Sequence, residues 1–175
     1  SFGDICFSDD GKTLYATALK HAHIRVYSMN IQSGKLTELV SRHTNHGLQR
    51  SGNTLYFIQD SLTTPAEIFS YDLDTKNIRK RTGVNDAVLE QVAFSTPEEF
   101  WFENRDGDKI HGWILRPVPF DSHKRYPLAF YIHGGPQGSW EDHFHYRWNL
   151  QVMPAQGYVT VAIDFRSSTG YGDAF

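Results

Sequence analysis

The sequence has little of what marks disulfide-rich, zinc-binding or membrane-spanning proteins. Its 175 residues include one cysteine, Cys6, which excludes an internal disulfide framework and a cysteine-based zinc site. The longest apolar-rich run, residues 128–132, has the length of a strand, so no membrane-spanning segment is expected. The first residues lack the charged and apolar regions of a signal peptide, which leaves the location open between secreted and cytoplasmic.

An excess of basic charge is also missing. The net charge is −3, so neither a nucleic acid nor an anionic membrane is expected as a partner. Hydrophobic residues make up 39% of the chain and aromatic residues 14%, which argues against disorder and for a packed, β-rich core.

The polar pairs in the sequence predict no metal or cofactor. The histidine pairs 21/23 and 143/145 have a spacing that puts both rings on one face of a strand, but neither has further ligands beside it. We interpret them as solvated loop histidines. The carboxylate pairs 98/99 and 141/142 are expected on solvated faces. Of the tryptophans, residues 113, 140 and 148 are expected either to line a substrate pocket or to be buried beneath the first part of the chain.

The first 82 residues contain an internal repeat. Its matching segments are residues 13–15 with 54–56, 24–27 with 68–71, and 34–36 with 76–78, at offsets of 41, 44 and 42. The drift places a length change in the loop around residues 62–65. Each unit predicts four short strands, and this period is typical of β-propeller blades. Two unrelated meanders with similar turns are the alternative. Because two blades cannot close a propeller, we expect the chain to be an internal segment of a longer protein.

The pattern changes after about residue 92. Strands are expected at residues 99–103, 109–115 and 127–132, then a helix within residues 142–156, then a strand at 158–165 that is apolar enough to be buried on both faces. A strand, a helix and a strand at this spacing predict a parallel βαβ unit. We therefore expect β-propeller blades over residues 1–92 and the N-terminal part of an α/β domain over residues 93–175.

Two glycine-containing segments follow predicted buried strands. In His133-Gly134-Gly135-Pro136, the two glycines let the backbone turn sharply and bring N–H groups close to a ligand. Such a segment supplies an oxyanion-hole N–H in α/β-hydrolases, and a plain tight turn is the alternative. Residues 164–172 form the second segment, at a strand end where open α/β sheets bind ligands.

Taken in order, these features resemble the prolyl oligopeptidase family of serine peptidases. The resemblance rests on the two repeats, Asp106-Gly107 leading to Gly112-Trp113, the His-Gly-Gly-Pro segment, and the Arg-x-Ser-x-Gly-Tyr-Gly pattern of residues 166–172. Residues 137–140 and 147–149 are most similar to the acylaminoacyl-peptidase and dipeptidyl-peptidase 5 branch. The second part of the chain would then be the start of an α/β-hydrolase domain, cut off before its nucleophile.

The resemblance implies a serine exopeptidase that hydrolyses short peptides through an acyl-enzyme and releases N-terminal dipeptides. Alternatives are an acylaminoacyl peptidase or esterase of the same fold, or a non-catalytic propeller binding protein; an oligomer is possible. The resemblance implies an oxyanion hole at Gly134 or Gly135. It also implies that further residues shape the site, namely His133, Pro136, Arg166, Ser168 and Tyr171.

Two departures from the family pattern are visible. No Gly-x-Ser-x-Gly elbow occurs, so the catalytic triad is expected downstream of Phe175, no catalytic residue is assigned in this chain, and the chain alone is expected to be inactive. Ser167 stands where the family usually has glycine, and serine disfavours a positive φ. Either this loop is locally distorted or residue 167 does not need that conformation.

Overall fold

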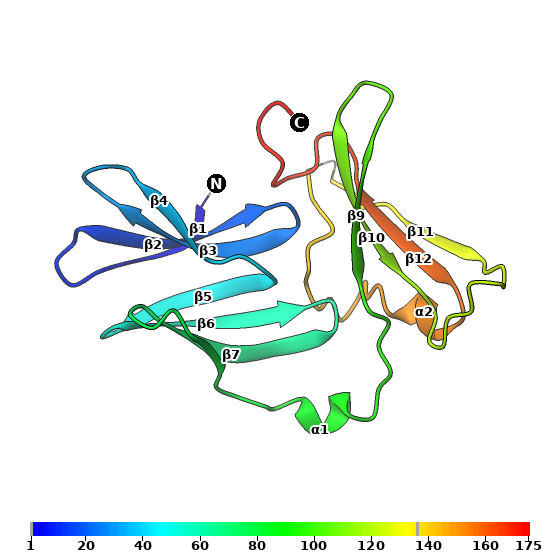
Figure 1. Ribbon diagram of the computed structural model, residues 1–175, viewed down its shortest axis with the longest axis horizontal. Coiled ribbons are helices and arrows are strands. Elements are labelled where there is room, and N and C mark those ends of the chain that lie inside the picture. The colour runs from blue at the N-terminus through cyan, green and yellow to red at the C-terminus, as the bar shows by residue number, and fades with distance from the viewer. Residues whose placement is uncertain (1, 136) are drawn as a thin grey trace.

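Two antiparallel four-stranded units stand beside a separate mixed sheet in the computed structural model, which describes residues 2–135 and 137–175 (Figure 1). The first unit contains β1 (Phe2–Phe7), β2 (Thr13–Lys20), β3 (His23–Asn30) and β4 (Leu36–Val40). The second contains β5 (Thr44–Ser51), β6 (Thr54–Ser61), β7 (Thr64–Asp72) and β8 (Ile78–Lys80). The predicted propeller blades are confirmed, and the two blades leave the propeller open.

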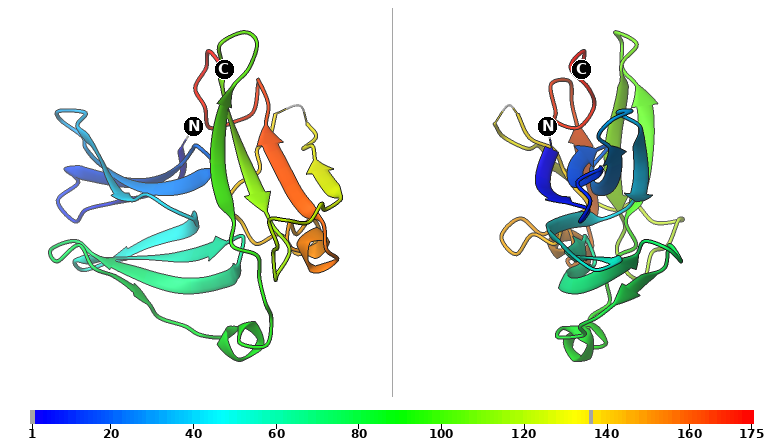
Figure 2. Two further views of the ribbon diagram at one scale, coloured as in Figure 1. Left: turned by 45° about the vertical axis from the view of Figure 1, so that its right-hand side comes forward. Right: turned by 90° about the vertical axis from the view of Figure 1, so that its left-hand side faces the viewer.

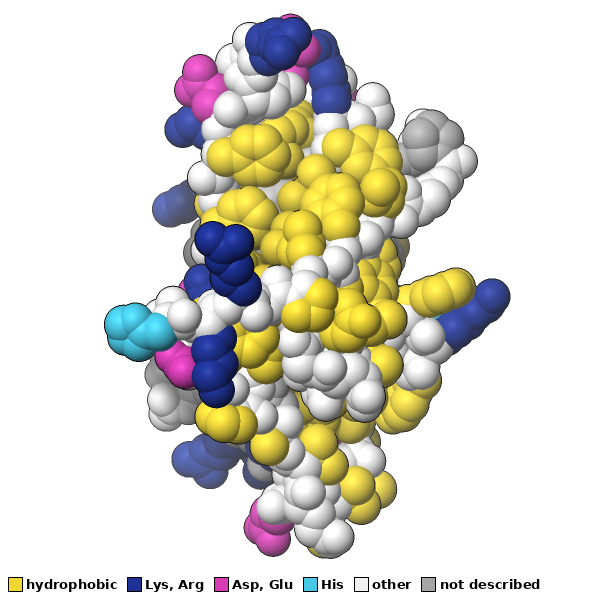
Figure 3. Space-filling model, turned by 90° about the vertical axis from the view of Figure 1, so that its right-hand side faces the viewer, with side chains coloured by type: hydrophobic (Ala, Val, Ile, Leu, Met, Phe, Trp, Pro, Cys, Tyr) yellow, Lys and Arg dark blue, Asp and Glu magenta, His cyan; other side chains and the backbone are white. Residues whose placement is uncertain are grey.

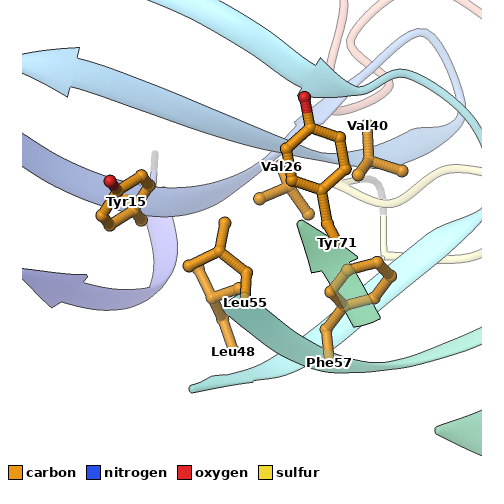
Figure 4. Close-up of a cluster of buried hydrophobic side chains, with 7 residues drawn as sticks. All are labelled: Tyr15, Val26, Val40, Leu48, Leu55, Phe57 and Tyr71. Carbon is orange, nitrogen blue, oxygen red and sulfur yellow. The ribbon is translucent and has the colours of Figure 1, made fainter. Parts of the chain in front are cut away.

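Side chains rather than backbone hydrogen bonds hold the two blades together. One residue pair, Ile24 with Thr44, joins β3 to β5 in parallel. The space between the blades is filled by a cluster of buried side chains (Figure 4), which consists of Tyr15, Val26, Val40, Leu48, Leu55, Phe57 and Tyr71. Aromatic and branched apolar residues on the inward faces of the strands thus build the core that the composition predicts.

The strand pairing corrects one part of the repeat. Leu14 pairs with Met29 in the first blade, and Leu55 pairs with Tyr71 in the second, so the third strands match at an offset of 42 rather than 44. A two-residue error is hard to detect because it leaves every side chain on the same face of the strand. The length change lies where it is expected, as a bulge in β7 at residues 65 and 66, where Pro65 need not donate to the ladder.

The second sheet has the order β11, β12, β10, β9. Its strands are β9 (Glu98–Glu103), β10 (Lys109–Leu115), β11 (Leu128–Tyr131) and β12 (Val159–Asp164). β11 and β12 are parallel and joined through helix α2 (Val152–Ala155), which confirms the predicted βαβ unit, whereas β10 runs antiparallel to both of its neighbours. A second short helix, α1 (Asp86–Leu89), lies in the connection between the blades and this sheet. No helix among the described residues is long and apolar enough to cross a bilayer.

The blades contact the second sheet through their hairpin turns. Ala22 and Leu62, at the β2–β3 and β6–β7 turns, are buried in one cluster with Trp113, Leu115, Leu150 and Ala162. The left view in Figure 2 shows the β9–β10 hairpin between the blades and the β11–β12 pair. The blade turns therefore lie next to the strands that carry the candidate site.

The predicted helix over residues 142–156 is wrong except for its last turn. Asp60 of the second blade accepts a hydrogen bond from the Phe144 N–H (2.8 Å) and contacts His143 Nδ1 (2.6 Å). The N–H groups of Arg147 and Trp148 donate to His145 Nδ1. These partners satisfy backbone donors outside a helix, so contact with the blade overrides local propensity.

Strand β12 is buried on one face, not on both as predicted. Thr160, Ala162 and Asp164 are fully buried, whereas the alternate residues are partly exposed. The neighbouring β11 also exposes Leu128 and Phe130. Figure 3 shows the hydrophobic side chains gathered over this side of the molecule.

Candidate functional site

The His133-Gly134-Gly135 turn directly follows β11, and its two glycines differ in what they permit. Gly135 has a φ of +135°, and a Cβ there would lie 2.6 Å from the backbone oxygen of Gln137. Gly135 is therefore required by the turn itself. A Cβ on Gly134 would meet nothing within 4 Å, so this glycine keeps open space beside the backbone. Pro136, also expected to shape the site, lies outside the described residues.

The backbone N–H groups of this turn are available to a ligand. Gly134 and Gly135 are exposed, and neither N–H donates to another residue in the described part of the chain. A cavity of about 890 Å³ opens beside Gly134 and is lined in part by Tyr131, Trp140 and Trp148. Trp113 is instead buried in the core, which is one of the two alternatives expected for the tryptophans.

His133 ties the turn to the loop formed by residues 166–172. Its Nε2 lies 2.8 Å from Ser168 Oγ, and its Nδ1 lies 3.1 Å from the Gly134 carbonyl oxygen. The imidazole stacks on Phe165 with ring centroids 4.3 Å apart. Ser168 is buried and donates its hydroxyl to the Phe165 carbonyl (2.6 Å). The structure thus brings His133 and Ser168 together, as expected of residues that shape one site.

Asp164, at the end of β12, makes hydrogen bonds to the segment that follows the glycine turn and to the loop formed by residues 166–172. Its fully buried carboxylate accepts hydrogen bonds from the Trp140 N–H (2.7 Å), the Tyr171 hydroxyl (2.5 Å) and His111 Nδ1 (3.3 Å). Burial and the adjacent carboxylate raise the pKa of Tyr171, which keeps its hydroxyl protonated as a donor. Tyr171 therefore lies beside this cluster, bonded to Asp164.

Arg166 points away from this cluster. Its guanidinium pairs with Asp108 (3.3 Å) in the β9–β10 turn and is more than half exposed. Arg166 therefore lies next to the hairpin, and within the described residues no hydrogen bond or ion pair joins its side chain to Gly134 or Gly135.

Ser167 adopts the conformation that its residue type disfavours. Its φ is +79°, so the loop keeps the backbone shape that glycine would take, and the alternative in which residue 167 avoids a positive φ is excluded. The loop is held there by neighbours: the Thr169 N–H donates to the Gly138 carbonyl (2.8 Å), and the His21 N–H donates to the Gly170 carbonyl (3.1 Å).

Replacing Ser167 by glycine is expected to stabilise the protein by about 1 kcal/mol. A left-handed residue other than glycine costs roughly 1–2 kcal/mol, and the greater freedom of glycine in the unfolded chain offsets part of that gain. Denaturant unfolding of the intact protein measures the change. Ser168→Gly is the matched control and is expected to destabilise, because it removes a buried hydroxyl bonded to His133. Equal behaviour of the two variants would contradict this explanation.

Several polar residues expected on solvated surfaces are instead buried or paired between the blades and the second sheet. His23 is buried, and its Nε2 lies 3.2 Å from Glu99 Oε1. Asp142 is buried and lies 2.7 Å from His43 Nδ1. His143 pairs with Asp60, which raises its pKa. Sequence spacing alone does not reveal such partners, because they lie 76 to 99 residues apart. In the described part of the chain, no group of three or more such residues is arranged to hold a metal.

The sequence comparisons point to peptidases. The chain is 32% identical over 166 residues to dipeptidyl-peptidase 5 from Schizosaccharomyces pombe, covering 93% of this chain and 23% of that protein. It is 36% identical over 184 residues to dipeptidyl-peptidase 5 from Arthroderma otae, covering 96% and 24%. The chain spans about a quarter of the length of these curated relatives. No family model matches it.

Solved structures share the fold. An acylaminoacyl peptidase from Pyrococcus horikoshii matches with a TM-score of 0.84 at 23% identity, covering all of this chain and 27% of that one. A puromycin-hydrolyzing peptidase from Mycobacterium tuberculosis matches with a TM-score of 0.68 at 20% identity, covering 97% and 26%. The fold is thus that of propeller blades followed by the first strands of an α/β-hydrolase. Together, the comparisons confirm the resemblance to the prolyl oligopeptidase family, in the branch of dipeptidyl-peptidase 5 and acylaminoacyl peptidase.

Proposed function

We propose that the intact protein is a serine peptidase that hydrolyses short peptides and releases N-terminal dipeptides. The observation that carries this proposal is the exposed Gly134–Gly135 turn, whose N–H groups are unpaired within the described chain. The turn is braced from behind by His133, Ser168 and Asp164. The identity of 32% and 36% to dipeptidyl-peptidase 5 supports the substrate class.

In this proposal, the chain stabilises charge rather than attacking the substrate. A serine supplied from outside these 175 residues attacks the peptide carbonyl, because no Gly-x-Ser-x-Gly elbow occurs here. The carbonyl oxygen becomes negatively charged, and an N–H of the Gly134–Gly135 turn donates to it. The leaving amine departs, an acyl-enzyme forms, and water then releases the dipeptide.

The two parts of the chain would have different roles, and we place the boundary between them between residues 92 and 93. The blades, residues 1–92, would restrict access to the site. Residues 93–175 would form the start of the hydrolase domain. The connection that contains α1 joins them, and the blade turns at Ala22 and Leu62 pack directly on the hydrolase sheet. Because the blades are held this close to the site, only short peptides would be able to reach it.

Release of acylated amino acids is the second candidate function. The observation that favours it is the TM-score of 0.84 to an acylaminoacyl peptidase, a match that extends over the whole chain. The two candidates differ at the substrate N-terminus, which is a free amine in one case and an amide in the other.

Labelling of the intact protein with a fluorophosphonate tests the proposal. One covalent adduct per chain, together with faster cleavage of a dipeptidyl naphthylamide than of an N-acetyl-aminoacyl naphthylamide, is the expected result. The reverse preference would favour the second candidate, and hydrolysis of nitrophenyl esters alone would identify an esterase. The absence of both adduct and turnover would overturn the proposal in favour of a non-catalytic binding protein.

A further inference from the structure

A row of histidine and carboxylate side chains, buried except for Glu99, connects the first blade with the floor of the candidate site. The row begins at Asp164, which holds both site loops, and passes to His111 Nδ1 at 3.3 Å. His111 Nε2 lies 3.6 Å from Glu99 Oε2, and the other oxygen of Glu99 lies 3.2 Å from His23 Nε2. Asp164 on β12 and Glu99 on β9 thus flank the imidazole of His111, which lies on β10, the strand between them.

The row reaches the blade at His23, whose Nδ1 also lies 3.6 Å from Asp142 Oδ2. The backbone N–H of His43 donates to His23 Nδ1 (3.0 Å), so the ring proton is on Nε2 and points toward Glu99. Both His23 and His111 are buried, whereas the Glu99 side chain is 31% exposed. Glu99 therefore contacts the blade on one side and the site on the other.

We propose that His111 is a positioning residue that couples docking of the first blade to the geometry of the Gly134–Gly135 turn. Glu99 is the carboxylate through which it contacts the blade. His111 contacts Asp164, and Asp164 fixes the Trp140 backbone and the Tyr171 hydroxyl and lies 3.9 Å from His133 Nε2, next to the glycines of the turn. This inference rests on the proposed function, because it assigns the coupling to the same site.

The charges around His111 favour its protonated form. Burial opposes the charge, but the carboxylates of Asp164 and Glu99 outweigh it and raise the pKa of His111 above its ordinary value. In return, the adjacent imidazoles of His111, at 3.6 Å, and His23, at 3.2 Å, hold the pKa of Glu99 well below its usual range. The titratable groups that face His111 from the elements packed around it are Glu99 on β9, Asp164 on β12, Tyr171 in the C-terminal loop, and His21 at the blade turn.

The coupling therefore has a defined pH range. His111 is bound more tightly when protonated, so its contribution is present below about pH 6.5 and is lost as the pH rises through its raised pKa. Glu99 contributes above about pH 4.5, and this contribution is lost only as the pH falls through its lowered pKa. Between these limits, the row is a cation flanked by two anions.

Glu99→Gln tests the coupling, and Glu98→Gln is its matched control. The adjacent Glu98 pairs with Arg116 and is half exposed, outside the row. In the intact protein, Glu99→Gln is expected to lower kcat about tenfold with KM changed less than twofold. It is also expected to move the alkaline limb of the kcat profile to lower pH by about one unit, because one of the two carboxylates that hold the proton on His111 is neutralised. Glu98→Gln is expected to match the wild type.

Hydrogen exchange provides a readout that does not need activity. In Glu99→Gln at pH 7, amide exchange is expected to increase about tenfold both at the blade turn, residues 20–22, and at residues 137–140 beside the glycines. Exchange and pH profile identical to those of Glu98→Gln would overturn the coupling while the peptidase proposal stands. A third outcome separates the two proposals in the other direction. If Glu99→Gln increases exchange at both segments, but the wild-type protein neither reacts with the fluorophosphonate nor turns over substrate, the coupling is supported and the peptidase proposal is overturned. Exchange that increases at the blade turn alone would show docking without coupling and would also overturn the inference.

Discussion

Gly135→Ala is expected to lower kcat of the intact protein by about 100-fold or more. The φ of +135° is unfavourable for alanine, and its Cβ would lie 2.6 Å from the Gln137 carbonyl oxygen and 2.7 Å from the Gln137 nitrogen. Because both contacts are with backbone, the turn has to rebuild, which moves its N–H groups away from the developing oxyanion. Loss of one such donor typically costs 10²- to 10³-fold in kcat. Steady-state cleavage of a dipeptidyl naphthylamide measures the effect.

Gly134→Ala is the control variant, because it distinguishes distortion of the backbone turn from obstruction of the substrate by an added methyl group. A methyl group at residue 134 meets nothing within 4 Å, so the free energy of unfolding is expected to stay within about 0.5 kcal/mol of the wild type. Any decrease in kcat for this variant then reports obstruction of the substrate. Wild-type kcat in Gly135→Ala would contradict the assignment of the oxyanion hole to this turn.

Asp164→Ala is expected to lower the free energy of unfolding by about 3 kcal/mol or more. The carboxylate is fully buried, and its removal leaves the Trp140 N–H, the Tyr171 hydroxyl and His111 without their acceptor. Breaking a buried, hydrogen-bonded charge pair typically costs 3–5 kcal/mol. Denaturant titration, followed by the fluorescence of the nearby tryptophans, measures the loss.

Asp108→Asn is the control for this experiment. Asp108 pairs with Arg166, whose side chain is more than half exposed, and such surface pairs contribute about 0–1 kcal/mol. Equal losses for Asp164→Ala and Asp108→Asn would mean that Asp164 does not organise the site.

The strands were predictable because their signals are local. Turn residues and alternating or continuous apolar runs marked the blade repeats and the strand ending at residue 164, and the two glycines marked the turn after β11. The alternation of apolar residues in a strand and the residue types of a turn depend on only a few neighbouring residues, so they can be recognised in a single sequence. The two-residue error at the third blade strand has the same origin, since period two cannot distinguish residue 68 from its neighbours at 66 and 70.

The row of histidines and carboxylates and the missing helix were not predictable, because they depend on contacts between residues far apart in the sequence. Asp60 is 84 residues from Phe144, and His23 is 76 residues from Glu99. From the local sequence alone, residues 142–156 are expected to form a helix, and Glu99 is expected to lie on a solvated face beside Glu98. One signal was available for Asp164: a charged residue at the end of an apolar strand needs buried partners.

The scarcity of backbone strand pairing between the two blades has an evolutionary consequence. Ile24 and Thr44 are the one backbone bridge from β3 to β5, so each blade is a nearly self-contained sheet that meets its neighbour through side chains. Duplication or loss of one blade-sized stretch of the gene therefore requires a new apolar face but breaks almost no backbone ladder.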